Sequence, residues 1–261
     1  MKKSLFAVTV LLLLLSPLAL AQSAFDGTWK VDLNNVQAPK KPTVITLKDG
    51  MYHCTCTTPA IDVKADGADH AVTGHPGYDT VAIKVVDDHT IQETDKKGGK
   101  VMSTDTTTVS ADGKTATDEF TDNSGATPVT GKVTSVRVAK GPAGSHSVSG
   151  SWRIKNYHTI SDSGLTFTYK VEGDTLSMTD PTGDSYTAKM DGSDAPFKGN
   201  PNTTSVSVKK LGANSLQETF KRDGKVRSVN TMTVQPDGKS MKILIHNKVE
   251  GTTMSAMADK Q

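Results

Sequence analysis

The only two cysteines of the chain lie in the run His53-Cys54-Thr55-Cys56. Thiolate and imidazole groups are ligands that zinc and copper prefer. In an oxidising compartment, however, a disulfide is the usual outcome. Two residues along a flat strand separate the Cα atoms by roughly 6.6 Å, so a bridge here requires a bulge or a turn. Three interpretations stay open, in this order: a Cys54–Cys56 disulfide, unpaired structural thiols, and a metal site; we expect no cofactor.

A glutamate stands inside a predicted strand at two related places, in Gln92-Glu93-Thr94 and in Gln217-Glu218-Thr219. An inward carboxylate would bind a polar group of a ligand, or act as a base if burial raised its pKa. The simpler interpretation is an outward glutamate paired with a lysine on the neighbouring strand, and we favour it. The candidate ligand-binding residues are Glu93, Glu218, Phe167 and Tyr169.

Common catalytic motifs are absent from the sequence. It contains no G-x-S-x-G elbow, no H-E-x-x-H, no glycine-rich phosphate loop and no paired carboxylates at a recognisable catalytic spacing. We therefore expect no catalytic residues and a protein that is not an enzyme.

A duplicated module must position these residues. Residues 64–114 align without a gap on residues 189–239, with 22 of 51 positions identical. Each copy opens with a G-x-W sequence, around Trp29 and Trp152. The run Lys-Gly-Pro-Ala-Gly-Ser-His-Ser that ends at residue 147 lacks periodicity and indicates a linker.

Alternating polarity and Asp-Gly pairs recur throughout both copies, as in residues 165–171. Period-two alternation predicts strands with one buried face, and Asp-Gly between them predicts hairpins. We expect an all-β protein of two tandem antiparallel meander barrels, one per repeat. The first repeat occupies residues 22–140, a linker follows at 141–147, and the second repeat occupies residues 148–261.

The G-x-W openings resemble those of the calycin superfamily, which contains lipocalins and fatty-acid-binding proteins. The sequence from Ala24 to Val31 is the most similar part, and the tandem layout resembles secreted lipocalin-like repeat proteins of bacteria. This resemblance implies that Trp29 and Trp152 each close one end of a barrel under a basic residue of the last strand. Arg137 is the candidate in the first copy, and the second copy has Met257 in the corresponding place. The helical lid and the late Arg-x-Tyr pair of fatty-acid-binding proteins are missing from the sequence.

The N-terminus has the features of a secretory signal peptide. It contains two lysines, then an apolar run, then the triplet Ala19-Leu20-Ala21, and this order predicts cleavage after Ala21. We therefore expect residues 1–21 to be removed and the mature form to keep no membrane anchor. Removing Lys2 and Lys3 leaves 28 basic and 28 acidic side chains, which argues against nucleic-acid binding.

We therefore expect a secreted or periplasmic, non-enzymatic protein of two lipocalin-like modules that binds a small, partly apolar ligand. The alternative is an envelope or extracellular protein-interaction module, structural or inhibitory, with solid barrel cores. No protein partner can be named from the sequence. A cavity in one copy alone would identify the working half.

Overall fold

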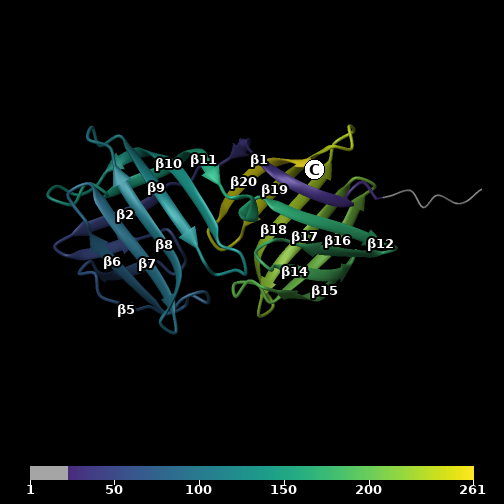
Figure 1. Cartoon of the computed structure of the whole chain (residues 1–261), viewed down its shortest axis with the longest axis horizontal. Coiled ribbons are helices and arrows are strands. Elements are labelled where there is room, and N and C mark those ends of the chain that lie inside the picture. Colours follow the sequence, from purple (N-terminus) through teal and green to yellow (C-terminus); the bar gives the residue numbers. More distant parts are fainter. Residues whose placement is uncertain (1–22) are drawn as a thin grey trace, which may run out of the picture.

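The computed structural model describes residues 23–261 and contains two antiparallel ten-stranded sheets, each curled into a barrel, that lie side by side (Figure 1). The expected all-β fold with two antiparallel barrels is confirmed. The one helical element described is a short 3-10 turn at Asp162–Gly164. The predicted signal peptide lies outside the described residues.

Barrel 1 is made of ten strands that follow one another along the chain. They are β2 (Thr43–Lys48), β3 (Met51–Cys54), β4 (Ile61–Lys64), β5 (His70–Ala71), β6 (Thr80–Val85), β7 (Thr90–Lys97), β8 (Lys100–Val109), β9 (Thr115–Asp122), β10 (Val129–Lys140) and β11 (Gly150–Ile160). The sheet is nearly closed: β4 and β5 are its two edges, and the Gly67 N–H beyond β4 donates to the Ile83 carbonyl of β6 at 2.9 Å.

Barrel 2 is a closed barrel of nine consecutive strands and one distant strand. They are β1 (Gly27–Gln37), β12 (Thr166–Glu172), β13 (Thr175–Thr179), β14 (Ser185–Lys189), β15 (Asp191–Lys198), β16 (Ser205–Gly212), β17 (Ser215–Arg222), β18 (Lys225–Val234), β19 (Ser240–Asn247) and β20 (Thr252–Lys260).

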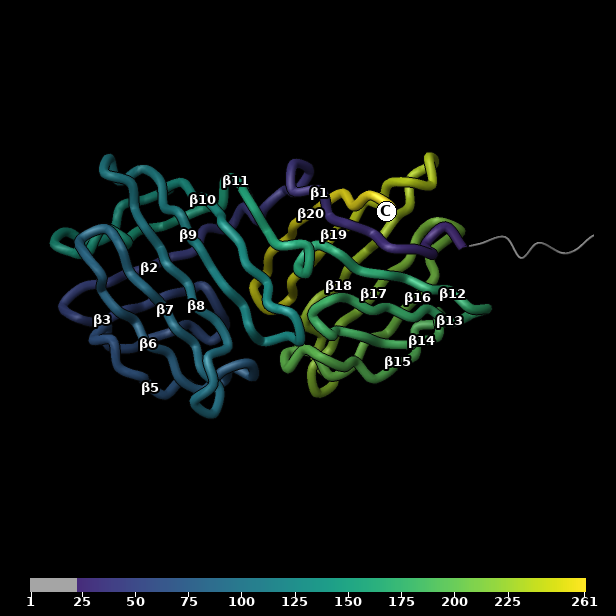
Figure 2. Tube along the Cα trace, in the orientation of Figure 1, coloured from purple at the N-terminus to yellow at the C-terminus, as the bar shows by residue number. Residues whose placement is uncertain are grey.

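The two sequence repeats exchange their first strands. Strand β1 pairs with β12 and β20 of the second repeat, while β11 pairs with β10 and β2 of the first. Figure 2 shows the purple β1 lying in the barrel made of green and yellow strands. The barrels therefore do not coincide with residues 22–140 and 148–261: barrel 1 is a continuous insert, 43–160, between β1 and the rest of barrel 2.

The two first strands occupy equivalent places in the two barrels. Gly27 lies opposite Tyr169 of β12 just as Gly150 lies opposite Ile45 of β2. Strand β11 pairs with its chain neighbour β10 across the connection 141–149, and β1 takes the equivalent place beside β20.

A tryptophan closes one end of each barrel beneath a basic side chain. In barrel 1 the guanidinium carbon of Arg137 lies 4.0 Å from the ring centroid of Trp152, and in barrel 2 Lys260 Nζ lies 5.1 Å from the centroid of Trp29. Arg137 thus covers Trp152 and not the tryptophan of its own repeat. The expectation that Met257 stands in the second basic position is wrong, since Lys260 is the residue paired with Trp29.

The glycine of each G-x-W motif makes room for that cation. Gly150 has a φ of 150°, and a Cβ there would lie 2.5 Å from a guanidinium nitrogen of Arg137. Gly27 has a φ of 121°, and its Cβ would lie 3.0 Å from the Lys260 side chain. The motif is therefore a packing requirement of the closed end.

Candidate functional site

Barrel 1 contains a cavity of about 370 Å³. The cavity wall combines apolar and aromatic side chains with acidic and hydroxyl groups. The lining residues are Thr43, Ile45, Tyr52, Cys54, Cys56, Thr57, Tyr78, Glu93, Asp95, Asp105, Thr107, Ala116, Asp118, Val133, Ser135, Trp152 and Ile154. A volume of this size is in the range of small-molecule sites.

Four carboxyl groups reach the cavity from three adjacent strands. Glu93 and Asp95 lie two residues apart on β7, so the period of the strand turns both to the interior. Asp105 of β8 lies directly opposite Glu93, and Asp118 of β9 lies opposite Thr107. The lining residues include no lysine, arginine or histidine, so no basic side chain on the wall balances these acids.

Hydroxyl groups satisfy part of this acidic surface. The Tyr52 hydroxyl donates to Glu93 Oε2 at 3.2 Å, and the Ser103 hydroxyl donates to Asp95 Oδ2 at 2.8 Å. Thr107 donates to an Asp118 oxygen at 2.6 Å. The other oxygen of Asp95, Oδ1, is fully buried and has no hydrogen-bond partner within residues 23–261. A buried acceptor of this kind is costly unless something fills the place beside it.

The carboxyl groups hold their protons more tightly than exposed acids do. Burial raises the pKa of Glu93 to about 8, with further contributions from the negative charges of Asp95 and Asp105. Burial, followed by the charge of Asp118, raises the pKa of Asp105 to about 7. Burial also raises the pKa values of Asp95 and Asp118. Near neutral pH the empty cavity therefore holds both ionised and protonated carboxyl groups.

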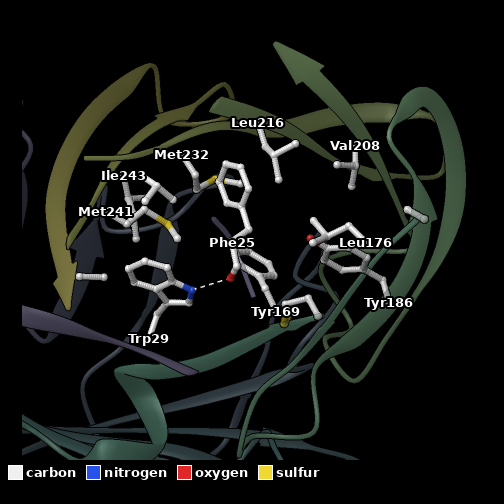
Figure 3. Packing of buried hydrophobic residues seen from close by; sticks show 14 of the residues in the cluster. Phe25, Trp29, Tyr169, Leu176, Tyr186, Val208, Leu216, Met232, Met241 and Ile243 are labelled. Atoms are coloured by element: carbon white, nitrogen blue, oxygen red, sulfur yellow. Dashed lines mark hydrogen bonds between the residues drawn. The ribbon is translucent and has the colours of Figure 1, made fainter. Parts of the chain in front are cut away.

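Barrel 2 is packed with large side chains, as Figure 3 shows, whereas barrel 1 contains the cavity. Phe25, Trp29, Leu176, Met232 and Met241 are fully buried in its interior. The G-x-W strand carries Phe25 into this core, since it precedes β1 by two residues.

Glu218 is the counterpart of Glu93 in this packed barrel, opposite Val208 as Glu93 is opposite Ile83. Glu218 is 3% exposed and accepts hydrogen bonds from Tyr169, at 2.6 Å, and from Tyr186. The carboxyl group is enclosed by two phenols and faces no comparable acidic partners.

Each of the other three acids in the cavity has a non-acidic counterpart in barrel 2. The strand registers match Asp95 with Phe220, Asp105 with Asn230, and Asp118 with Ile243. The β-barrel framework is thus built equally well without them, so the acids are a property of the cavity and not a requirement of the fold.

The sequence-based candidates separate into two groups. Glu93 lines the cavity, whereas Glu218 and Tyr169 are buried in barrel 2, and Phe167 packs against the same core. The favoured interpretation of outward glutamates is wrong for both, because their strand phase turns them inward. Sequence reasoning missed Asp95, Asp105 and Asp118. For Asp95 and Asp105 the available signal was an acid inside a strand that the repeat alignment matches with Phe220 and Asn230; Asp118 lies beyond the aligned residues.

Cys54 and Cys56 form a disulfide at the cavity wall. The chain bends after β3, which brings their Cα atoms to 5.3 Å. His53 lies on the outer face, where its Nδ1 is 2.7 Å from Asp62 Oδ1. His53 and the two bridged sulfurs therefore do not make a ligand set, and no group of three or more metal-ligating side chains converges within residues 23–261.

Comparisons with known proteins identify no relative: no family model, no curated protein and no solved structure matches the chain. Among the residues that the structure describes, no helix is long and apolar enough to cross a membrane.

Proposed function

We propose that this is an exported, non-enzymatic binding protein in which barrel 1 holds one small, partly apolar ligand and barrel 2 is a packed support. The observation that carries the proposal is the difference between the barrels. One encloses about 370 Å³ lined by aromatic and polar groups, while the equivalent positions of the other are occupied by Phe220, Met232 and Ile243.

Membership of the calycin superfamily is part of this proposal. Two antiparallel ten-stranded barrels, each with a G-x-W strand and a cation above the tryptophan, support it. The alternative of an interaction module assumed two solid cores, and barrel 1 does not fit that assumption.

The substitutions that test the proposal copy barrel 2 into barrel 1. In the variant Thr107→Met/Asp118→Ile, the cavity receives the residues found at the equivalent positions of the packed barrel. Wild-type protein purified from the periplasm should carry a bound small molecule in native mass spectrometry. The filled variant should appear at its apo mass.

The matched control is Thr108→Met, which adds the same side chain at an exposed neighbouring position of β8. The control should retain the bound mass. Apo mass for all three proteins, together with no uptake of small organic probes, would refute the proposed function.

A further inference from the structure

We propose that the ligand of barrel 1 is a small organic cation, a protonated amine with a compact aromatic or aliphatic body. This inference rests on the proposed function and adds the chemical class of the ligand. It follows from charge, from an unsatisfied acceptor, from the comparison of the two barrels, and from the aromatic wall.

Charge is the first argument. Four carboxyl groups line one cavity, and no lysine, arginine or histidine stands among the lining residues. Buried charges in proteins are usually paired. The missing positive partner is therefore expected to arrive from outside, on the ligand.

The hydrogen-bond inventory gives a second argument, at one of these four carboxyl groups. Two buried side-chain oxygens lack a partner within residues 23–261: Asp95 Oδ1, of a residue that lines the cavity, and Asn230 Oδ1 in barrel 2. Asp95 Oδ1 is fully buried without a donor among residues 23–261, although its other oxygen is bound by Ser103. An ammonium group has three donors and no acceptor, which suits a wall made of carboxylate oxygens. A neutral apolar ligand would leave this oxygen unpaired and desolvated.

The fold itself does not require the acids. At the three matched positions barrel 2 has phenylalanine, asparagine and isoleucine, and it closes with the same strand order. Three half-buried carboxyl groups on one cavity wall reduce the stability of the unliganded protein, so their presence in barrel 1 indicates a use for them.

The aromatic and apolar part of the lining distinguishes an organic cation from a metal ion. Tyr52, Tyr78 and Trp152 line the cavity together with Ile45 and Ile154. Aromatic faces attract ammonium groups and pack against apolar groups. The volume exceeds what a bare ion needs, and no three ligating side chains within the described chain converge on one point.

Binding of a cation must be coupled to proton release. Glu93 is faced by Tyr52 from β3, by Asp95 on its own strand and by Asp105 from β8, with Asp118 of β9 beyond. A bound ammonium favours the ionised carboxylates, whereas low pH returns protons to them. Affinity should therefore rise from about pH 6 to about pH 8, a range in which an aliphatic amine stays protonated.

Other titratable groups near the site do not reverse this direction. His75 stacks on Tyr78 at 4.6 Å between centroids, and burial lowers its pKa. Arg137 lies over Trp152 at the closed end and remains charged throughout. Glu93 and Asp105 have pKa values of about 8 and about 7, which lie in this window.

Three probes of similar size and different charge test the inference by isothermal titration calorimetry on the signal-free full chain. They are phenethylamine, phenethyl alcohol and hydrocinnamate. We expect phenethylamine to bind at least about tenfold more tightly than the alcohol, and hydrocinnamate to bind least. Phenethylamine affinity should rise by about tenfold between pH 6 and pH 8, with proton release.

The variant Asp105→Asn, which copies barrel 2, should weaken phenethylamine binding by about tenfold and leave binding of the alcohol unchanged. Unchanged alcohol binding also shows that the variant is folded. Alcohol binding equal to or tighter than amine binding would overturn the cation inference while the proposed function stands. If none of the probes binds the wild type, the cation inference fails, and the native mass measurement decides the proposed function separately.

Discussion

Glu93 and Glu218 stand at the same position of two equivalent strands, yet Glu93 faces a cavity and Glu218 is enclosed by two tyrosines. The same residue type therefore lines a cavity in one barrel and is part of the packed core in the other. Its neighbours decide which: Asp95 and Asp105 beside Glu93, and Phe220 and Asn230 beside Glu218.

Glu93 should make the empty protein less stable as pH rises. Its folded pKa, about 8, is above the unfolded value near 4.5, so its stabilising contribution is complete below about pH 4.5 and is lost as pH rises to about 8. Glu93→Gln should remove this loss and raise the free energy of unfolding at about pH 8 by about 1–3 kcal/mol. Urea unfolding at several pH values measures it.

The matched control for that experiment is Glu119→Gln. Glu119 lies on the outer face of β9 and pairs with Lys132 at 2.7 Å in solvent. Its replacement should change stability by less than about 0.5 kcal/mol at any pH. An identical pH profile for wild type and Glu93→Gln would contradict the buried position of Glu93.

Glu218 should matter for stability and not for binding. Glu218→Ala removes the acceptor of the Tyr169 and Tyr186 hydroxyl groups and leaves a hole in a packed core. We expect a loss of about 2–4 kcal/mol in the free energy of unfolding. Phenethylamine affinity, measured below the unfolding transition, should stay within about twofold of wild type. A large loss of affinity would place the working site in barrel 2.

The strand exchange predicts the result of deleting residues 23–37. Barrel 2 loses β1 with Trp29 and Phe25, whereas barrel 1 keeps all ten of its strands. Limited proteolysis should therefore digest residues 166–260 and leave a resistant fragment that contains residues 43–160. Protection of the second repeat and digestion of the first would instead indicate barrels without exchange.

The cysteine pair should have a small effect on stability and none on metal uptake. A bridge that closes so short a loop removes little chain entropy, so Cys54→Ser/Cys56→Ser should cost about 1–2 kcal/mol. Equilibrium dialysis should give equal zinc and copper uptake for this variant and for wild type. Metal uptake that disappears with the two sulfurs would restore the metal interpretation.

Much of the fold is predictable because it depends on local pattern. Period-two alternation and Asp-Gly turns give the strands and hairpins, and the repeat gives two equivalent units. The exchange of β1 and β11 is not predictable in this way, because the two strands carry the same motif and fit the same register. Connection length does not decide the assignment either, since the connections 38–42 and 161–165 of the unexchanged pairings are shorter than the connection 141–149 between the paired strands β10 and β11.

Less of the candidate site than of the fold could be predicted from the sequence. The sequence shows Glu93 as an acid within a predicted strand. Whether its side chain points inward or outward depends on the phase of β7, and a shift of one residue in that phase turns an inward side chain outward. No sequence motif connects Asp95, Asp105 and Asp118. The three aspartates come together only when β7, β8 and β9 pair. The cavity itself follows from side-chain volumes that differ between the copies.

The most direct test uses the two tryptophans of the chain, one in each barrel. The ring of Trp152 lines the cavity, and Trp29 lies in the packed core of barrel 2. In a two-dimensional NMR titration with phenethylamine, the indole N–H resonance of Trp152 should shift and saturate while that of Trp29 stays in place. A shift confined to Trp29, or no shift of either resonance at saturating amine, would contradict a binding site in barrel 1.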